Sequence, residues 1–478
     1  MRVRKNAADL VGWDPILLWY AKAVAVMKAR PITDPTSWRY QGAIHGYNPA
    51  SDPFRTPGET LPPQAQRTKF WDRCQHGSWF FLPWHRAYLL YFEKTVAKAV
   101  SQLGGPADWA LPYWNYTPSV AARTLPKAFR DRNLPDGAPN ALFVQRRSPA
   151  ANGGQPVGSA AAADTTSCLG KTRFINNGFV SQFGGPRTGF NHVGQVFGEC
   201  ESVPHNTMHG AIGGSGGWMN DPDLAALDPI FWLHHANIDR LWQVWLARPG
   251  RTNPTDAAWL TGLTFDFHDE AGNPTTIRAA DVLNTAAPLL DYRYDPVATP
   301  APAPPGPQTM EHAEPIPEMV GASPERLTLG PAAGHVQIAL RPPTGPAAHA
   351  SGAEAAGATR SVHLCLDNVT AASHPVESYE VYVNLPEGAS PAAHSELMAG
   401  LLPAFGMVKA SQPGSEHGGS GVSYSFDITR IARALQSRNQ WNPATLRVSF
   451  VPHATEGDRE EELQTAPVQV GRVSLYYA

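Results

Sequence analysis

The sequence predicts a mainly α-helical N-terminal domain, a proline-rich linker and a C-terminal antiparallel β-sandwich. Three observations predict this fold class: apolar residues recur every three or four positions in the first part of the chain, a run of prolines follows, and a period of two prevails after it. A chain of 478 residues is also longer than one hydrophobic core usually supports. We expect domains at residues 1–295 and 321–478, joined by a linker at 296–320.

The first domain shows helical periodicity at residues 17–27, 88–100 and 231–246. The apolar residues of each segment share one helix face, so we expect these helices to pack in the core. Between residues 122 and 198 the chain is rich in proline, glycine, asparagine and alanine, with a low-complexity stretch at 148–163. We expect a surface loop with little regular structure here, which could also form the entrance wall of a site.

The second domain begins after the proline-rich segment at residues 297–307, which favours an extended polyproline conformation. Beyond it, polar and apolar residues alternate in short runs between turn-forming residues, as in strands with one buried face. We expect an antiparallel β-sandwich with one short helix near residues 429–436. The expected strands are residues 335–340, 361–366, 379–385, 422–428, 446–451 and 468–477.

The composition is globular and excludes several classes of function. Hydrophobic residues make up 42% of the chain and charged residues 17%, with a net charge of -3. The sequence has no basic stripe for nucleic-acid phosphates and no apolar run of the ~18 residues that a membrane span needs. The N-terminal segment begins with basic residues, but Asp14 and Lys22 interrupt its apolar positions, so we expect an amphipathic helix there rather than a signal peptide. Four widely spaced cysteines form no disulfide framework, and we expect a cytoplasmic protein without nucleic-acid or membrane partners.

Two groups of three histidines are the strongest functional feature of the sequence. The first group is His45, His76 and His85, and the second is His205, His209 and His235. Six neutral imidazoles without a carboxylate ligand favour copper, because di-iron and di-magnesium centres need oxygen anions to offset their charge. The pattern therefore predicts a pair of copper ions and chemistry with dioxygen.

Local patterns support the first group in part. Pro83 suits the first turn of a helix, which places His85 inside that helix, while His76 arrives from the preceding segment. His45 must come from a separate helix, and taken alone it is more often a surface or core histidine than a ligand. Cys74 lies two residues before His76, and a free cysteine is usually just a small buried residue.

In the second group, His205 and His209 are four residues apart, so on a helix their rings share one face and can bind one ion together. Zinc enzymes with an HExxH motif use the same spacing, but Asn206 stands where their catalytic glutamate would be. A zinc hydrolase built on this pair is an alternative interpretation. It leaves the first group of histidines unexplained.

The last ligand of the second group lies on a helix whose start is predicted by Asp228 followed by Pro229. His234 and His235 face directions roughly 100° apart on that helix, so one can bind metal while its neighbour packs behind it. Asp239 lies four residues after His235. Its carboxylate either orients a histidine through the second ring nitrogen or forms an ordinary salt bridge on the helix surface.

The histidine motifs resemble those of the tyrosinase, catechol oxidase and haemocyanin family. The segments that carry the resemblance are HGSWFFLPWHRAYLLYFE at 76–93, the HxxxH pair at 205–209 and DPIFWLHHANIDRLW at 228–242. The likeness extends over residues 5–295 and ends in Tyr-Arg-Tyr at 292–294, which resembles the tyrosine motif that closes the core domain of that family.

The resemblance implies a type-3 centre of two copper ions in a four-helix bundle, with three histidines on each ion and His235 rather than its neighbour as the sixth ligand. It also implies dioxygen as co-substrate, ortho-hydroxylation of monophenols and oxidation of o-diphenols to o-quinones. Small phenols would be the partners, and a homo-oligomer is compatible with this reading. Alternatives are a catechol oxidase without monophenolase activity and a haemocyanin-like oxygen-binding protein, although one copy without tandem repeats argues against the latter.

Cys74-Gln-His76 is similar to the Cys-x-His arrangement of fungal tyrosinases and molluscan haemocyanins, in which the sulfur is joined to the histidine ring as a thioether. The resemblance implies the same link between Cys74 and His76 here. Plant members of the family place that cysteine differently and carry N-terminal disulfides that this sequence lacks.

Further site residues follow from the same resemblance. Glu201 and Asn206 match a pair that holds a water in the family, and such a water can accept the proton of the phenol. Without the resemblance, Glu201 would be an ordinary loop carboxylate, with Glu199 as a near competitor. Trp218 and Met219 fall where the family lines the substrate mouth, but core packing explains this pair equally well.

The C-terminal domain resembles the extra domain of latent plant and fungal enzymes, most clearly at residues 376–384 and 448–453. In those enzymes the domain covers the copper mouth with one inserted side chain. The resemblance implies a covering domain here and latency until it is displaced, and cleavage near Pro304 is the way to test this. Within the loop at 402–419, Phe405 is our candidate for the inserted side chain.

Overall fold

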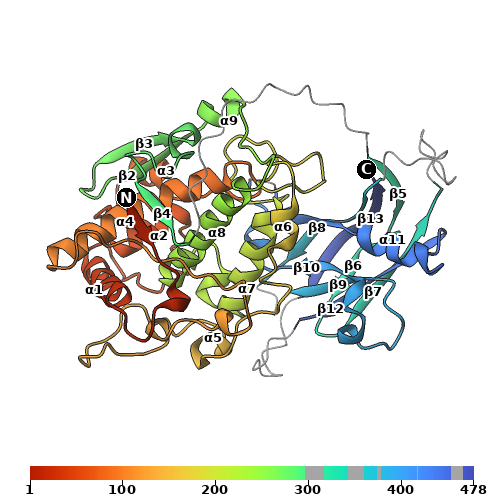
Figure 1. Cartoon of the computed structure of the whole chain (residues 1–478), viewed down its shortest axis with the longest axis horizontal. Coiled ribbons are helices and arrows are strands. Elements are labelled where there is room, and N and C mark those ends of the chain that lie inside the picture. The colour runs from red at the N-terminus through yellow and green to blue at the C-terminus, as the bar shows by residue number, and fades with distance from the viewer. Residues whose placement is uncertain (297–316, 343–359, 374–377, 417, 454–466) are drawn as a thin grey trace.

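The computed structural model describes residues 1–296, 317–342, 360–373, 378–416, 418–453 and 467–478. A helical N-terminal half lies beside a C-terminal half built around a β-sheet (Figure 1). Most of the predicted linker at 296–320, including Pro304, lies outside the described residues.

The N-terminal half consists of helices around one apolar core. The long helix α4 is central to it, because it contacts both α1 and α8. Asp228 caps α8 as its position before Pro229 predicts, since its carboxylate accepts a hydrogen bond from the Ile230 amide at 3.1 Å. The α-helices of this half are α1 (Pro15–Ala29), α2 (Trp38–His45), α3 (Gln64–Phe70), α4 (Phe81–Gln102), α5 (Pro149–Gly153), α6 (Thr166–Gly170), α7 (Thr207–Gly213), α8 (Ile230–Leu246) and α9 (Ala257–Thr261).

Short strands and long loops complete this half. Strand β1 (Arg2–Arg4) pairs in parallel with β4 (Tyr292–Tyr294), so the beginning and the end of the domain lie side by side. Strands β2 (Thr264–His268) and β3 (Pro274–Arg278) form an antiparallel hairpin. Between residues 122 and 198 the chain forms only short helical segments, as its composition predicts.

The ligand-bearing helices differ greatly in length. Helices α4 and α8 span 22 and 17 residues, whereas α2 and α7 span eight and seven. The four-helix bundle implied by the resemblance therefore stays a prediction: two long helices pack together, and two short ones bring further histidines to them.

The strands of the C-terminal half form one continuous antiparallel sheet in the order β10-β9-β12-β7-β5-β13-β8-β11, with β6 beside β13. The end strands β10 and β11 contact each other, so the sheet curls almost into a barrel. The elements are β5 (Glu318–Ala322), β6 (Leu327–Leu329), β7 (Gly334–Leu340), β8 (Val362–Ala371), β9 (Tyr379–Val383), β10 (Met398–Leu402), α10 (Met407–Ala410), β11 (Val422–Asp427), α11 (Thr429–Ser437), β12 (Thr445–Pro452) and β13 (Val468–Tyr477).

This near-barrel corrects the predicted β-sandwich. A period of two shows that each strand has one buried face, but it does not show whether the strands belong to two sheets or to one curled sheet. Accumulated strand twist favours curling in a sheet with this many strands. The distinction therefore depends on pairing between distant strands.

Each half has its own apolar core, and the two cores exchange side chains. Leu401 and Phe405 of the C-terminal half pack into the core of the helical half. In return, Val193 and Phe197 from the long loop pack into the core of the sheet. None of the helices in the described part of the chain has the length and apolar character to cross a membrane. The reciprocal insertion places the C-terminal half directly over one side of the histidine groups.

Candidate metal centre

Six buried histidines from both sequence groups meet between the helices. In the first group, His45 ends α2, His76 lies in the segment before α4, and His85 lies in the second turn of α4. In the second group, the irregular helical segment Glu201–Asn206 carries His205, α7 carries His209, and α8 carries His235. The structure thus brings together all six residues that the sequence proposes as ligands.

The two groups face each other across a short gap. The rings of His85 and His235 stack with their centroids 4.3 Å apart, and those of His76 and His205 are 5.9 Å apart. Three sets of candidate ligand atoms each lie within 4.8 Å of one another: His205, His209, His234 and His235; His45, Cys74 and His76; and His45, His85 and His235. Because the sets share members, they form one extended centre rather than two separate sites.

Hydrogen bonds at Nδ1 fix the orientation of four of these rings. Each of these Nδ1 atoms faces a carbonyl or amide oxygen, which can only accept, so Nδ1 carries the proton and donates it. The pairs are His45 with Pro222 O at 2.9 Å, His85 with Phe81 O at 2.8 Å, His205 with Asn206 Oδ1 at 2.8 Å and His209 with Met219 O at 2.7 Å. The lone pair of each ring is therefore on Nε2 and points into the centre.

Nε2 is buried without a hydrogen-bond partner within the described residues in three of these rings, His45, His85 and His205, and also in His76. A buried polar atom without a partner is costly, and a metal ion removes that cost by taking the lone pair. Nitrogen ligands with an anchored second nitrogen suit copper. These residues therefore fit a pair of copper ions.

Burial lowers the pKa of all six histidines, and that of His76 to about 3. Desolvation is the largest cause in each, because charged imidazolium is disfavoured away from water. The rings are thus neutral at physiological pH. Neutral imidazole is the form that binds a metal ion.

His234 is also buried at the centre, and neither of its ring nitrogens has a partner among the described residues. Its ring stacks on Tyr116 with centroids 5.7 Å apart and lies 4.7 Å from the ring of His209. His235 instead brings its Nε2 to 3.4 Å from His209 Nε2. The two neighbours therefore diverge, with His235 facing both histidine groups.

Cys74 lies beside His76, with its Sγ 3.4 Å from the Nδ1 of that ring. The same sulfur lies 3.1 Å from Nδ1 of His192, a residue that the sequence analysis did not single out. Burial raises the pKa of the Cys74 thiol well above its usual value. No local sequence pattern indicates His192, because it belongs to the long loop and lies more than a hundred residues after Cys74 in the chain.

Glu201 is buried, and both of its carboxylate oxygens accept a hydrogen bond from the amide of Gly77, at 2.9 and 3.0 Å. Gly77 is required there, because it has a φ of 56° and a Cβ would lie 2.7 Å from Val196 O. Burial raises the pKa of the Glu201 carboxyl well above its usual value. The competing Glu199 instead accepts a hydrogen bond from Ser167 Oγ at 2.6 Å, away from the histidines.

A pocket opens beside the centre, and the C-terminal half covers it. It is lined by His76, His192, Val193, Gly194, Phe197, Asn206, Pro222, Phe405, Gly406 and Lys409. The buried ring of Phe405 stacks on His209, with centroids 4.1 Å apart and 23° between the planes. The amide Nδ2 of Asn206 has no partner among the described residues.

The two proposed mouth residues contact other parts of the helical half. Met219 supports His209 from behind through its backbone carbonyl. Trp218 packs edge-on against Phe54, with ring centroids 5.6 Å apart. Neither residue is among the described residues that line the pocket.

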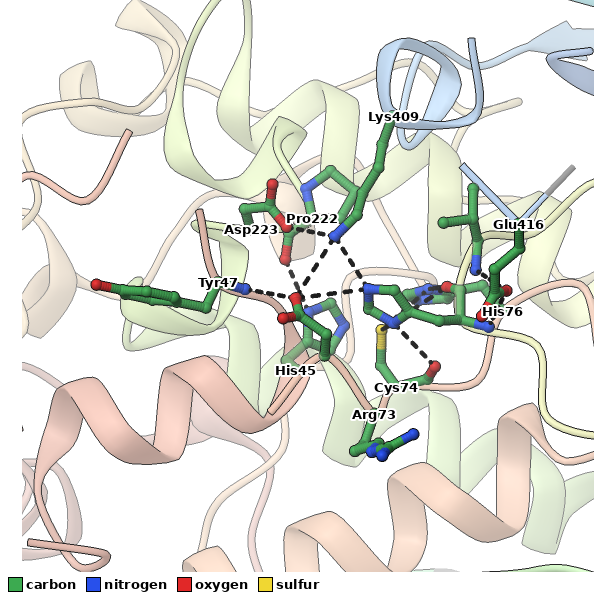
Figure 2. Close-up of polar contacts among 12 residues, drawn as sticks. His45, Tyr47, Arg73, Cys74, His76, Pro222, Asp223, Lys409 and Glu416 are labelled. Carbon is green, nitrogen blue, oxygen red and sulfur yellow. Dashed lines mark hydrogen bonds and ion pairs between the residues drawn. The ribbon is translucent and has the colours of Figure 1, made fainter. Parts of the chain in front are cut away.

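A charged group borders the pocket. Lys409 of α10 forms a close ion pair with Asp223, lies 3.8 Å from Asp72 Oδ1, and lies 2.9 Å from His192 Nε2 (Figure 2). Burial lowers the pKa of Lys409, but the two carboxylates outweigh it and hold the pKa above its usual value. Nearby, Glu416 Oε2 accepts hydrogen bonds from the amides of His192 and Val193 at 2.8 and 3.2 Å.

Asp239 corrects both interpretations that the sequence left open. It is buried, and its carboxylate bonds to Arg86 Nε at 2.5 Å and to the hydroxyls of Tyr292 and Tyr294 at 2.5 and 2.6 Å. Arg4 Nη1 approaches it at 3.4 Å. Asp239 is therefore the centre of a buried polar cluster that ties β1 and β4 to α4 and α8, rather than a partner of a histidine or a surface salt bridge.

Comparison with known families matches three parts of the chain. The model of the common central domain of tyrosinase matches residues 35–248, and that of the polyphenol oxidase middle domain matches 253–303. Residues 316–478 match a domain of unknown function.

Two curated proteins illustrate the range of relatives. A tyrosinase of Hahella sp. (strain CCB-MM4) is 38% identical over 497 aligned positions, which cover 100% of this chain and 99% of that protein. Aureusidin synthase of Antirrhinum majus is 30% identical over 63% of this chain, which spans only 52% of that plant enzyme. Similarity over the whole length is thus to the bacterial protein, and similarity to the plant protein is confined to part of each chain.

Two solved structures share the complete fold. Latent aurone synthase superimposes with a TM-score of 0.63 at 21% identity, covering 100% of this chain and 89% of that one. Latent apple tyrosinase superimposes with a TM-score of 0.62 at 22% identity, covering 100% of this chain and 97% of that one. The fold of the whole chain, with its helical half and its sheet, is therefore similar to that of solved structures.

Proposed function

The chain belongs to the tyrosinase and polyphenol oxidase family of type-3 copper oxidoreductases, and from this premise we propose that it hydroxylates monophenols at the ortho position and oxidises o-diphenols to o-quinones, with dioxygen as co-substrate. The observation that carries the proposal is the convergence of six neutral, buried imidazoles, four of which form a hydrogen bond through Nδ1 and turn the lone pair of Nε2 into one centre. Small phenols are the proposed substrates, and a cytoplasmic location stays a prediction.

The histidines would hold the two copper ions in a dry cavity, with His45, His76 and His85 on one ion and His205, His209 and His235 on the other. The copper pair supplies the electron transfer and the activation of dioxygen. The protein contributes fixed ligand orientations, because the anchored Nδ1 atoms prevent the rings from turning. It also excludes bulk water, because all six rings are buried.

Glu201 is the proposed acceptor of the phenol proton. A general base works best when its pKa lies near the working pH, and burial moves the pKa of this carboxyl upward from its usual value. Asn206 is placed to assist, since its Oδ1 is held by His205 while its Nδ2 is free to donate within the described part of the site. We propose that the pair holds a water that relays the proton.

The C-terminal half is proposed to make the enzyme latent. Phe405 covers the ring of His209, and Lys409 and Glu416 fasten the same segment to the rim of the pocket. A phenol ring needs the face that Phe405 occupies. Displacement of this segment is therefore proposed to precede turnover.

The test is to load the purified chain with copper, count the metal, and follow oxygen uptake and quinone formation. We expect two copper ions per chain and turnover of both a monophenol and its catechol, with a marked increase after limited proteolysis in the linker. Turnover of the catechol alone would remove the monophenolase part of the proposal. Reversible oxygen binding without turnover would indicate an oxygen carrier, and indifference to oxygen would overturn the proposal as a whole.

A further inference from the structure

The covering segment carries an aromatic ring and an ammonium group four residues apart. The ring of Phe405 lies on His209, while the ammonium of Lys409 lies between carboxylates of the helical half. Both side chains line the same pocket. A covering side chain needs only a ring to block the centre, so the buried ammonium beside it calls for a separate explanation.

The carboxylates that receive Lys409 belong to the N-terminal half, which anchors the side chain of Asp72 and the backbone of Asp223. Asp72 Oδ1 accepts a hydrogen bond from the Tyr47 amide at 2.8 Å. The backbone amide of Asp223 is bound by Asp221 Oδ1 at 2.9 Å. The side chain of Asp223 is only 13% exposed, whereas that of Asp72 is 44% exposed. A cation site thus remains at the pocket rim when the cover leaves.

Lys409 is the main charge that neutralises this pair of carboxylates. Arg73, the nearest arginine in sequence, turns its guanidinium away from them (Figure 2). It donates to the backbone carbonyls of Thr68 and Lys69. The ring nitrogen of His192 accepts a hydrogen bond from Lys409, and another ammonium can use the same acceptor. Removal of Lys409 therefore leaves the carboxylates without their main counter-charge.

We propose that Asp223 and Asp72 form a subsite for the ammonium group of phenolic amines, and that Phe405 and Lys409 occupy the places of the substrate's ring and amine in the covered state. This substrate class rests on the phenol oxidation proposed above. Asn206, proposed above to hold the water that takes the phenol proton, lines the same pocket with an amide donor that has no partner in its described part. Phenols that carry a carboxylate are disfavoured at this rim, because like charges repel.

The test uses the full-length, copper-loaded chain with the double substitution Phe405→Ala/Lys409→Ala, which opens the pocket without cleavage. We compare kcat/KM for tyramine, 4-ethylphenol and 3-(4-hydroxyphenyl)propionate, which differ mainly in charge. The expected order is amine, then neutral, then acid, with the amine favoured over the neutral phenol by about tenfold, the size of effect that a partly buried charge pair supports. Adding Asp223→Asn is expected to remove most of that ratio, mainly through KM.

A matched control separates charge recognition from a loosened cover. Glu416→Gln in the same background weakens another contact between the two halves, but it leaves both aspartates in place. The ratio of amine to neutral phenol is expected to stay the same in this variant. A ratio that falls equally with Glu416→Gln would overturn the subsite.

A binding measurement distinguishes failure of the subsite from failure of the proposed function. Phenethylammonium has the ring and the amine but no phenol, so calorimetry can follow its binding without turnover. We expect binding to the open variant and a loss of about tenfold in affinity with Asp223→Asn. Turnover of the neutral phenol without amine preference overturns the subsite alone. If no phenol is oxidised, the proposed function fails, and binding of phenethylammonium decides the subsite.

Discussion

At the scale of single residues, the orientation of each anchored histidine ring depends on the atom that its Nδ1 contacts. The backbone carbonyl of Pro222 anchors His45, and that of Met219 anchors His209. Gly46 permits the first of these contacts, because a Cβ at this position would lie 2.7 Å from Pro222 O. Backbone atoms thus orient these two ligands, and substitution of the supporting side chains alone does not remove them.

The choice between His234 and His235 gives a direct prediction. His235→Asn is expected to lower the copper content from two ions per chain to about one and to reduce catechol oxidation by at least about a hundredfold. Loss of a residue that only hydrogen-bonds to a metal ligand already reduces metal affinity or activity by about 10- to 100-fold, and His235 is a proposed ligand itself. His234→Asn is the matched substitution in the adjacent position and is expected to keep both ions. Metal analysis of the two purified variants checks this. Loss of copper from His234→Asn alone would reverse the assignment.

The contact between Cys74 and His76 predicts a covalent change on maturation. When the chain is loaded with copper in air, we expect a thioether to form, because the sulfur already lies against the ring. One hydrogen leaves the thiol and one leaves the ring, with dioxygen as the oxidant, so the intact mass falls by that of two hydrogen atoms. Cys74→Ala is expected to abolish the mass change, and Cys365→Ala, at a buried cysteine of the sheet, to preserve it. An unchanged mass in the active protein would contradict the link.

What the sequence reveals of the site depends on how local each signal is. The HxxxH spacing, the helix start before His235 and the Cys-x-His triplet are local, and the structure brings those residues together. The roles of His192, Asp223 and Lys409 depend on contacts between segments more than a hundred residues apart, so no local pattern indicates them. The partners of Asp239 are also distant, because Arg86 and Tyr292 lie 153 and 53 residues from it along the chain, so its helical spacing from His235 does not indicate its role.

At the level of helices and strands, periodicity predicts the elements that have one apolar face. Strand β13 occupies the predicted residues, and helix α8 begins within one residue of its predicted start. In the C-terminal half, alternation does not indicate β5, β6 and β10, and the short strands β1 to β4 of the helical half were not predicted either. Glycines interrupt two of these strands for reasons of packing: a Cβ at Gly321 would lie 2.6 Å from Ala339 O, and one at Gly400 would lie 2.6 Å from the ring of Phe426.

The cluster around Asp239 predicts which contact between elements is most costly to break. Asp239→Asn is expected to destabilise the fold by about 3 kcal/mol, because it leaves the buried guanidinium groups of Arg4 and Arg86 short of a counter-charge. Chemical denaturation of the metal-free chain measures this. Asp256→Asn, which breaks the exposed pair with Arg187, is the control, with an expected loss below about 1 kcal/mol.

The same cluster predicts a dependence on pH. Burial alone would raise the pKa of Asp239, but Arg86 and Arg4 outweigh it and hold the pKa below its usual value. A carboxyl with a lowered pKa in the folded state stabilises the fold fully above its unfolded pKa, and this contribution is lost as the pH falls through the folded value. The stability difference between the wild type and Asp239→Asn should therefore be constant at neutral pH and shrink below about pH 4. A constant difference down to lower pH would contradict this account.

At the scale of the whole molecule, the two halves are joined by interpenetrating cores and by backbone pairing. The Ser423 amide donates to Gln195 O at 2.6 Å, so β11 pairs through its backbone with the long loop of the helical half. Phe197 packs against Tyr424 with ring centroids 5.6 Å apart. The cover therefore rests on a broad interface, of which Phe405 is the part that reaches the histidines.

This arrangement predicts that activation depends on vacating the ring of His209 and not merely on loosening the interface. In the uncleaved, copper-loaded chain, Phe405→Ala is expected to raise catechol oxidation by about tenfold or more, because the substrate then reaches the face that Phe405 covers. Met407 lies two residues after Phe405, and its buried side chain belongs to the core of the sheet. Met407→Ala should therefore cost about 2 kcal/mol or more of stability. It leaves Phe405 in place, so we expect little activation. Initial rates and thermal melting of both variants check this, and equal activation by Met407→Ala would show that the cover acts through the stability of the interface.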